Sequence, residues 1–300
     1  MTMFKGLRLQ RYLAIFCTSL GLLSCTYFLF PTRLAWTKVE PPLTSVRDDP
    51  LPICIGILAF EGVRTLQQTL LSYRDGLFPR VREKKIFFQE LNTDSRVSWA
   101  RSVTTNFPGL DLMYDELNVG QRGGFLKLVN SCEQPFVLIL EEDFRIAVGA
   151  KVQEQLSLAM KLLEGDIDAV RLRSRLLGGE PNYAKIAWEN SGSRLGAGVM
   201  ETHLLEHVMW DSDAELHVPQ LRVCMLKPKT WCASSRNACY TNNPVLYKTS
   251  FLKHVVLKVP DDPEIHFEPW LTEYWTGQNF TVAYSDGIFT HDRLDRDRVV

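Results

Sequence analysis

An apolar run followed directly by three acids constrains the fold of this chain more than any other stretch. Five apolar residues, Phe136-Val137-Leu138-Ile139-Leu140, follow Pro135 without a polar interruption. Such a run, which includes β-branched residues, predicts a strand that is buried on both faces. Glu141, Glu142 and Asp143 come next. Carboxylates at the carboxyl end of a buried strand lie where open α/β sheets bind their ligands. The stretch therefore predicts a polar site at the end of a central strand.

The three adjacent acids also suggest a cation. Carboxylates that are packed together repel one another unless a positive charge lies between them. Mg²⁺ and Mn²⁺ prefer oxygen ligands of this kind and commonly share them with substrate phosphates. A charged turn after a buried strand is the alternative interpretation.

Strand-like and helix-like segments alternate along most of the chain. Strands are predicted at 53–60, 85–91, 110–114, 136–140, 168–175 and 281–289, with a short one that begins at 243. Helices are predicted at 63–73, 98–106, 125–132, 152–163, up to 256, and at 268–277. This alternation is typical of an α/β fold with a mainly parallel sheet. The region from about 178 to 241 gives no clear pattern.

Composition excludes some classes of function. A 45% hydrophobic fraction is sufficient for a buried core. The formal net charge is -1, and no basic block is present, so the chain is not expected to bind nucleic acid. Arg171, Arg173 and Arg175 share one face of a predicted strand, which indicates either a site for phosphate or an acidic acceptor, or a solvated face.

The N-terminal segment predicts a membrane anchor. Lys5, Arg8 and Arg11 precede residues 12–30, which carry no charge. That length can span a bilayer, and the basic flank places the N-terminus in the cytoplasm. We therefore expect a cytoplasmic tail at 1–11, a transmembrane signal anchor at 12–30, a stem at 31–51 and a luminal domain at 52–300. A cleaved signal peptide is the competing interpretation.

Cysteine positions fit an oxidising lumen. Cys224, Cys232 and Cys239 could supply one disulfide and leave one odd thiol, whereas Cys54 is expected to be simply buried in its strand. The sequon at Asn279 could carry a glycan only on the luminal side.

Several short segments, in this order, resemble the GT-A fold of the family 2 glycosyltransferases. The segment Ile55 to Phe60 with the helix after it is similar to the first strand and helix of that fold. Asn118-Val119-Gly120, with Gly123 and Gly124, resembles its glycine-containing segment. Glu141-Glu142-Asp143 resembles the acidic DxD motif. The resemblance covers roughly residues 52–293. It implies a GT-A-like, Rossmann-type three-layer α/β/α sandwich with a mainly parallel central sheet, preceded by one transmembrane helix.

The resemblance also implies roles for individual residues. A nucleotide-sugar donor, UDP- or GDP-linked, is expected to contact Ala59, Phe60, Glu61, Arg64, Glu90, Gly120, Arg122, Glu141 and Glu142. Mn²⁺ or Mg²⁺ is expected on Asp143, with Glu141 and His291 as further ligands. Two features depart from the family pattern. Glu141 replaces the usual first Asp, and the loop after the second strand offers Glu90 and Asp94 in place of Asp-Gly-Ser-Asp.

The catalytic base is expected in the segment Phe267-Glu268-Pro269-Trp270, which resembles the family's acidic segment. Glu268 is preferred as the base and Glu273 is the alternative, while Trp270 and Trp275 could stack on sugar rings. The resemblance thus implies a metal-dependent glycosyltransferase that inverts its sugar and modifies a glycan, glycoprotein or glycolipid. The anchor and stem resemble the layout of type II membrane enzymes of the Golgi or ER. The alternatives are an inactive carbohydrate-binding or scaffolding protein and a metal-dependent phosphotransferase or hydrolase.

Overall fold

The computed structural model describes residues 49–60, 63–177, 215, 220–260, 262 and 266–292. All of these belong to a compact unit that spans Arg47–Val300. The predicted tail, the membrane segment and most of the stem lie outside the described residues. Within the described ranges, no helix combines the length and the hydropathy that a membrane span requires.

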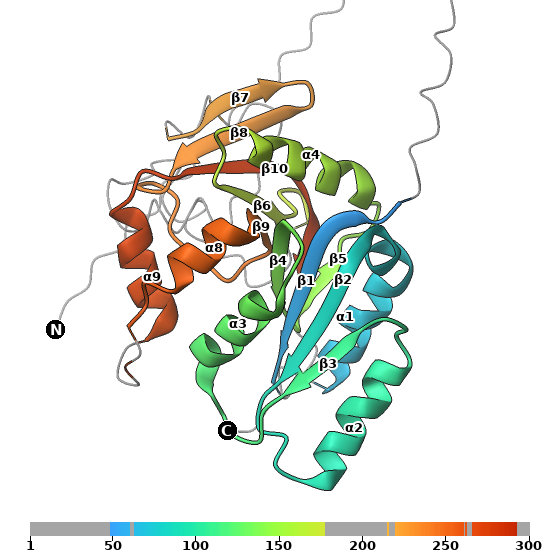
Figure 1. The fold of residues 1–300 in the computed structure, drawn as a ribbon. Coiled ribbons are helices and arrows are strands. Elements are labelled where there is room, and N and C mark those ends of the chain that lie inside the picture. Colours follow the sequence, from blue (N-terminus) through green and yellow to red (C-terminus); the bar gives the residue numbers. More distant parts are fainter. Residues whose placement is uncertain are drawn as a thin grey trace, which may run out of the picture. The chain divides into compact units, whose positions relative to one another are not determined.

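The core of the unit is a ten-stranded mixed sheet with the order β3-β2-β1-β4-β9-β6-β10-β8-β7 (Figure 1). Its first part is parallel, as predicted. It consists of β1 (Leu51–Ala59), β2 (Val81–Phe88), β3 (Asp111–Tyr114) and β4 (Phe136–Glu141). The strand β1 lies between β2 and β4 and runs parallel to both. Because parallel strands end at the same edge, the residues after β1, β2 and β4 come together.

The second part of the sheet is mixed. The short strand β9 (Val245–Lys248) runs antiparallel between β4 and β6 (Ala169–Arg173). Next to β6, and parallel to it, lies β10 (Thr281–His291). The antiparallel strands β8 (Lys229–Ser234) and β7 (Arg222–Leu226) extend the sheet beyond β10. The three-residue strand β5 (Phe144–Ile146) pairs with the end of β10. The sequence had not indicated β5, β7 or β8.

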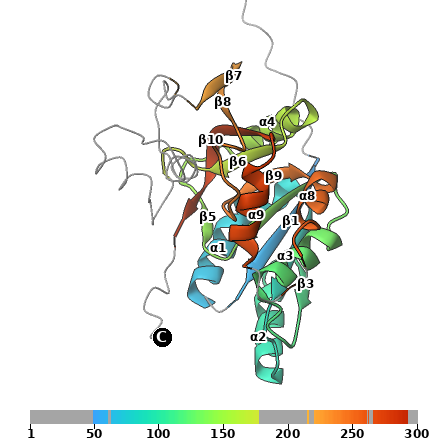
Figure 2. The same cartoon turned by 90° about the vertical axis from the view of Figure 1, so that its left-hand side faces the viewer.

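Helices cover both faces of the sheet. One face is covered by α1 (Val63–Gly76), α2 (Asp94–Thr105) and α4 (Val152–Glu164), with the short 3-10 helix η1 (Phe78–Arg80) after α1. The other face is covered by α3 (Gly120–Ser131), α8 (Thr249–Val256) and α9 (Phe267–Thr276). Figure 2 turns the side that carries α8 and α9 toward the viewer. The described part is therefore a three-layer α/β/α arrangement, as the sequence predicts.

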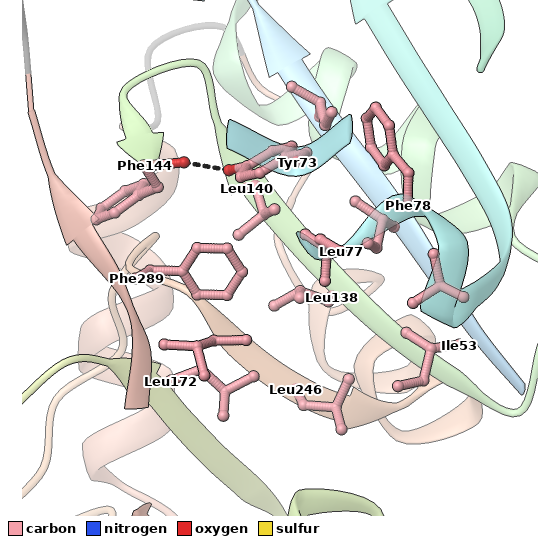
Figure 3. Packing of buried hydrophobic residues seen from close by; sticks show 14 of the residues in the cluster. Ile53, Tyr73, Leu77, Phe78, Leu138, Leu140, Phe144, Leu172, Leu246 and Phe289 are labelled. Carbon is pink, nitrogen blue, oxygen red and sulfur yellow. Dashed lines mark hydrogen bonds between the residues drawn. The ribbon is translucent and has the colours of Figure 1, made fainter. Parts of the chain in front are cut away.

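Alternating side chains of β1 fix the two helical layers. Ile53, Ile55 and Ile57 belong to the core cluster under α1, α2 and α4, part of which is shown in Figure 3. Cys54 and Leu58 belong to the cluster under α3, α8 and α9. Because side chains of a strand point alternately to opposite faces, a strand that is apolar throughout requires cover on both sides.

A glycine lets α3 approach the sheet closely. A Cβ atom on Gly124 would lie 2.6 Å from Cδ1 of Leu58 and 3.2 Å from Cδ1 of Phe87. Real Cβ atoms do not approach other atoms so closely, so a side chain at this position would force Leu58 or α3 to shift. The contact places the start of α3 against the carboxyl ends of β1 and β2.

Two disulfides link described residues. Cys224 and Cys232 join β7 to β8, and buried Cys239 is the odd thiol, which is one of the outcomes that the sequence left open. The prediction for Cys54 was wrong. It is buried, but it forms a disulfide with Cys132 at the end of α3. The sequence could not indicate this bond because the two cysteines are 78 residues apart and meet only when α3 packs on β1.

Candidate functional site

The residues after β1, β2 and β4 surround two adjoining cavities. The aromatic cavity has a volume of about 490 Å³. It is lined by Phe60, Val63, Gln89, Glu90, Leu91, Ser95, Arg96 and Trp99. The acidic cavity has a volume of about 290 Å³. It is lined by Leu58, Phe60, Gln89, Asn118, Gln121, Glu141, Glu142 and Asp143. Phe60 and Gln89 line both cavities, so the two form one continuous recess.

The acidic cavity combines carboxylates with side-chain amides. Gln89, Asn118 and Gln121 supply the amides, and the three consecutive acids after β4 supply the carboxylates. Among the described residues, no lysine or arginine lines this cavity. A ligand rich in hydroxyl groups can bond to such a lining, because carboxylates accept and amides both donate and accept hydrogen bonds. A phosphate would be repelled unless a cation accompanied it.

Glu142 ties the acidic segment to the end of β1. Its Oε2 accepts a hydrogen bond of 2.6 Å from the backbone N–H of Phe60, and its side chain is buried. A hydrogen bond to a charged acceptor is stronger than one between neutral groups. The loop after β1 and the loop after β4 are therefore held together at the point where the two cavities meet.

Asp143 lies against His291, which the sequence places 148 residues later. The Oδ2 atom of Asp143 is 3.1 Å from Nε2 of His291. Pairing of β5 with β10 brings the two residues together, and the N–H of Asp292 donates a 2.8 Å bond to the carbonyl of Asp143. The rings of Phe144 and His291 also contact each other, with centroids 5.0 Å apart. Asp143 is thus held in two ways, by the contact of its side chain with His291 and by the hydrogen bond of its carbonyl with Asp292.

Tyr73 supports this arrangement from the core. Its hydroxyl donates to the carbonyl of Phe144, as Figure 3 shows. Burial raises the pKa of Tyr73 well above its usual value, and the negative charge of Asp143 raises the same pKa further. Tyr73 is therefore a neutral donor at any physiological pH, and it anchors the turn that carries Asp143.

Glu141 is a half-buried carboxylate in an acidic environment. Its pKa is raised to about 7, first by burial and then by the charges of Asp143 and Glu268. A 3.2 Å hydrogen bond from Gln121 and the proximity of His291 lower the pKa, but less than the other causes raise it. A divalent cation among these groups would reverse the shift, because its charge favours the ionised carboxylate.

Glu268 reaches the same cluster from α9. It lies in the first turn of this helix, where a negative charge is favourable to the helix dipole. Its Oε1 accepts a 3.3 Å hydrogen bond from the backbone N–H of Asn242. Burial raises the pKa of Tyr240, and the charges of Glu268 and Glu141 both contribute to that rise. Glu273, in contrast, is exposed on α9.

Several expected donor residues do not line the cavities. Ala59 is fully buried at the end of β1, and Arg64 is exposed on the first turn of α1. Gly120 begins α3 with a φ of 68°, and its N–H donates to Oδ1 of Asn118. Arg122 instead donates from Nη2 to the carbonyl of Val259, at 3.2 Å. Glu61 lies outside the described residues.

Of the residues expected to contact the donor, Phe60, Glu90, Glu141 and Glu142 do line the recess. Asp143, which is expected to bind the metal, also lines it. Sequence reasoning missed Gln89, Trp99 and Gln121. Gln89 and Gln121 adjoin residues that it did select, whereas Trp99 resembled any aromatic residue on an amphipathic helix. Trp99 reaches the aromatic cavity from α2, where its ring also contacts Phe88 with centroids 5.3 Å apart.

The two candidate sugar platforms have different environments. Trp275 is 1% exposed and donates to the carbonyl of Ala238, so it belongs to the core and cannot stack on a sugar. Trp270 is partly exposed and stacks on Tyr274, with centroids 5.7 Å apart.

The three arginines of the β6 region interact with the protein itself. Arg171 is buried and donates to the carbonyl of Cys239. Arg173 donates to Asn243, and Arg175 forms an ion pair with Asp286 at 2.7 Å. The alternative of a solvated face is therefore wrong for Arg171.

A divalent cation fits part of this geometry. Within the described ranges, no group of three or more His, Cys, Asp or Glu side chains is arranged to hold a metal ion. The expected set of Asp143, Glu141 and His291 is therefore not a preformed cage, because Asp143 and His291 bond to each other instead. Mg²⁺-like ions are commonly bound by one or two carboxylates together with substrate phosphates. The residues present fit an ion whose coordination a bound diphosphate completes.

Comparison with known proteins finds no family model and no curated protein that matches this chain. Solved structures do resemble it. TarS 1–349 of S. aureus in complex with UDP-GlcNAc is 15% identical, with a TM-score of 0.48, over 79% of this chain and 57% of that one. The mannosyltransferase PcManGT of Pyrobaculum calidifontis, in complex with GDP-Man and Mn²⁺, is 12% identical, with a TM-score of 0.49, over 83% of this chain and 60% of that one. This chain thus spans less than two thirds of either protein.

A third similar structure has another function. It is the 4-diphosphocytidyl-2C-methyl-D-erythritol synthase of Anaerococcus prevotii, which is 8% identical with a TM-score of 0.43, over 80% of this chain and 88% of that one. Likeness of this degree does not define an activity.

Proposed function

We propose that this chain is a glycosyltransferase that uses a nucleotide-sugar donor and a divalent metal ion, Mn²⁺ or Mg²⁺. The observation that carries the proposal is the recess formed by the aromatic and acidic cavities at the carboxyl ends of β1, β2 and β4. One end can stack and pair with a base, and the other can receive a sugar and a metal-bound diphosphate. A nucleotide sugar has these same parts in the same sequence.

Each cavity would bind a different part of the donor. Phe60, Val63 and Trp99 give the aromatic cavity apolar surfaces on which a flat base can lie. The amides and carboxylates of the acidic cavity suit sugar hydroxyls. Glu142 fixes the boundary between the cavities through its bond to Phe60. The ribose and diphosphate would cross the recess at this point.

Asp143 and His291 would hold the cation, with Glu141 near them. The bound ion would neutralise the diphosphate as it leaves. The remaining groups prepare this site without the ion, because Tyr73 and the N–H of Asp292 fix the turn that carries Asp143. Burial raises the pKa of Glu141, the charges of Asp143 and Glu268 raise it further, and a cation would relieve the repulsion among these three groups.

Glu268 is the proposed general base. The acceptor hydroxyl oxygen would attack the anomeric carbon while the bond from that carbon to the diphosphate oxygen breaks. The proton of the hydroxyl would pass to Glu268, and the bonding electrons would leave with the nucleoside diphosphate. This single displacement inverts the anomeric carbon. The proximity of Glu268 to Glu141 supports the assignment, and the exposed position of Glu273 argues against the alternative.

The test is a screen of the full chain against nucleotide sugars with Mn²⁺ and a mixture of glycan acceptors, followed by separation of the products. Transfer of the sugar to an acceptor is the expected result. Release of inorganic phosphate without transfer would indicate a phosphotransferase or hydrolase instead. Binding of glycans without turnover of any donor would indicate an inactive carbohydrate-binding protein.

The proposed location is the Golgi or ER membrane, with the catalytic domain in the lumen. The membrane segment predicted at 12–30 and the two disulfides support it, since disulfides persist in oxidising compartments. Asn279 is exposed, and its sequon could therefore carry a glycan. In sealed microsomes, residues 52–300 should resist added protease and the chain should shift on removal of N-glycans. Complete digestion would overturn this topology.

A further inference from the structure

The acidic cavity carries more negative charge than the metal ion of a bound donor can neutralise. Glu141, Glu142 and Asp143 line the cavity, and the charge of Glu268 acts on Glu141 from α9. A divalent ion carries two positive charges, and the diphosphate of a nucleotide sugar carries two negative ones. The ion and the diphosphate therefore balance each other and leave most of the carboxylate charge uncompensated. This charge restricts which sugar the cavity can receive.

Two arginines on the elements around the cavity are bonded to other parts of the protein. Arg122 lies in the first turn of α3, and its Nη2 donates a 3.2 Å hydrogen bond to the carbonyl of Val259. Arg145 lies in β5 and forms an ion pair of 2.6 Å with Asp292. Neither arginine lines the acidic cavity. A sugar acid would need such a cation, because a carboxylate that leaves water without a positive partner costs free energy.

Neutral hydroxyl groups, in contrast, find partners in the same lining. Gln121 donates from Nε2 to Oε1 of Glu141, which leaves its own side-chain oxygen to accept a hydrogen bond. Oδ1 of Asn118 accepts from the N–H of Gly120, which leaves its amino group to donate. A hydroxyl group both donates and accepts, so a neutral sugar can bond to both kinds of group.

We propose that the donor carries an uncharged sugar, a neutral hexose, and that the carboxylates of the acidic cavity reject sugar acids. This inference rests on the proposed function, because it names the class of sugar that the proposed donor carries. A hexose becomes a sugar acid when a carboxylate replaces its C6 hydroxymethyl group. The size of the sugar changes little, whereas the new charge would lie among the carboxylates and be repelled by them.

The test is calorimetric binding of three matched pairs of donors to the full chain with Mn²⁺. The pairs are UDP-glucose with UDP-glucuronic acid, UDP-galactose with UDP-galacturonic acid, and GDP-mannose with GDP-mannuronic acid. In each pair that binds, the neutral member should bind at least about tenfold more tightly than the acid. UDP and GDP, measured in parallel, give the affinity of the nucleotide without a sugar.

The variant Asn118→Arg tests whether charge causes the discrimination. Asn118 is exposed and lines the acidic cavity, so an arginine at this position adds a cation to the lining. The affinities for the two members of a pair should then differ at least about threefold less. Asn118→Ala is the matched control, because both variants lose the bond from the N–H of Gly120 and only one adds a charge. In Asn118→Ala the ratio of the two affinities should not change.

The outcomes separate this inference from the proposed function. Equal or tighter binding of the sugar acid in any pair would overturn the inference and leave a nucleotide-sugar enzyme. An unchanged ratio in Asn118→Arg, together with a normal melting temperature, would overturn charge as the cause of the discrimination. If none of the six donors binds in the presence of Mn²⁺, both the proposed function and the inference are wrong.

Discussion

The part of the sheet that residues 51–141 build and the part that residues 144–292 build contribute different things to the recess. The first part is parallel, with helices between its strands, and it supplies nearly all of the lining of both cavities. The second part is mixed, and it supplies His291 and Glu268, which reach the acidic cluster from β10 and α9. We infer that the first part binds the donor and the second part supplies the groups that act on it.

The two parts meet at three consecutive residues. Glu141 ends β4, Glu142 bonds back to the loop after β1, and Asp143 contacts β10 through His291. If the division is correct, substitutions on either side of this junction should separate donor binding from transfer.

The largest effect is expected at Glu268. Replacing it by glutamine removes the proposed base but keeps its shape, so transfer should fall by about 10² to 10⁴-fold. Donor affinity should remain nearly unchanged, because the proposed donor site lies in the first part. Steady-state kinetics together with donor binding measure both quantities. Glu273→Gln is the matched control, and a larger loss in the control than in Glu268→Gln would exchange the two roles.

The two disulfides allow the stabilities of the two parts to be compared. Cys54–Cys132 closes a separation of 78 residues in the first part, and Cys224–Cys232 closes one of 8 residues in the second. Chain entropy assigns about 4.5 kcal/mol to the first and about 2.5 kcal/mol to the second. Urea unfolding of Cys54→Ala/Cys132→Ala and Cys224→Ala/Cys232→Ala measures the difference. Equal losses would mean that the entropy of loop closure does not determine their contributions.

Asp143 should affect turnover more than folding. Asp143→Asn removes a charge from a crowded acidic cluster, so repulsion with Glu141 decreases while the proposed metal site loses its main ligand. Transfer should fall by about 10²-fold or more at saturating Mn²⁺. Asp111→Asn is the control for charge alone, because Asp111 is exposed at the amino end of β3, whereas the cavities lie at the carboxyl ends of the parallel strands. Normal turnover in Asp143→Asn would place the metal elsewhere.

The smallest effect concerns the packing of the first part. Gly124→Ala introduces a Cβ that would overlap Leu58 and press on Phe87. Overpacking of this kind typically costs about 1–3 kcal/mol. Thermal unfolding should therefore show a lower melting temperature. An unchanged melting temperature would show that α3 can shift away from β1 without cost.

The sequence predicted the first part of the fold well, because its strands and helices follow one another locally. The strand expected at 53–60 is β1 at 51–59, and the helix expected at 63–73 is α1 at 63–76. The second part was less predictable, because its pairing is not local. The strand β5 has only three residues and exists through pairing with β10, which lies far away in the sequence.

The site was predictable where chemistry is concentrated in one segment. Three acids after a buried strand, Glu141, Glu142 and Asp143, are recognisable in the sequence. The structure places His291 and Glu268 close to them. The orientation of single side chains could not be predicted. Arg122 bonds to Val259, away from the cavities, and Trp275 packs in the core, because tertiary contacts decide which face of a helix is buried.

The central claim is that the acidic cavity, which no described lysine or arginine lines, receives a diphosphate only with a divalent ion. The most direct measurement is calorimetric binding of GDP and UDP to the full chain in Mn²⁺ and, separately, in EDTA. The account predicts that the tighter of the two nucleotides loses at least about tenfold in affinity when EDTA replaces Mn²⁺. Equal affinity under both conditions would contradict it.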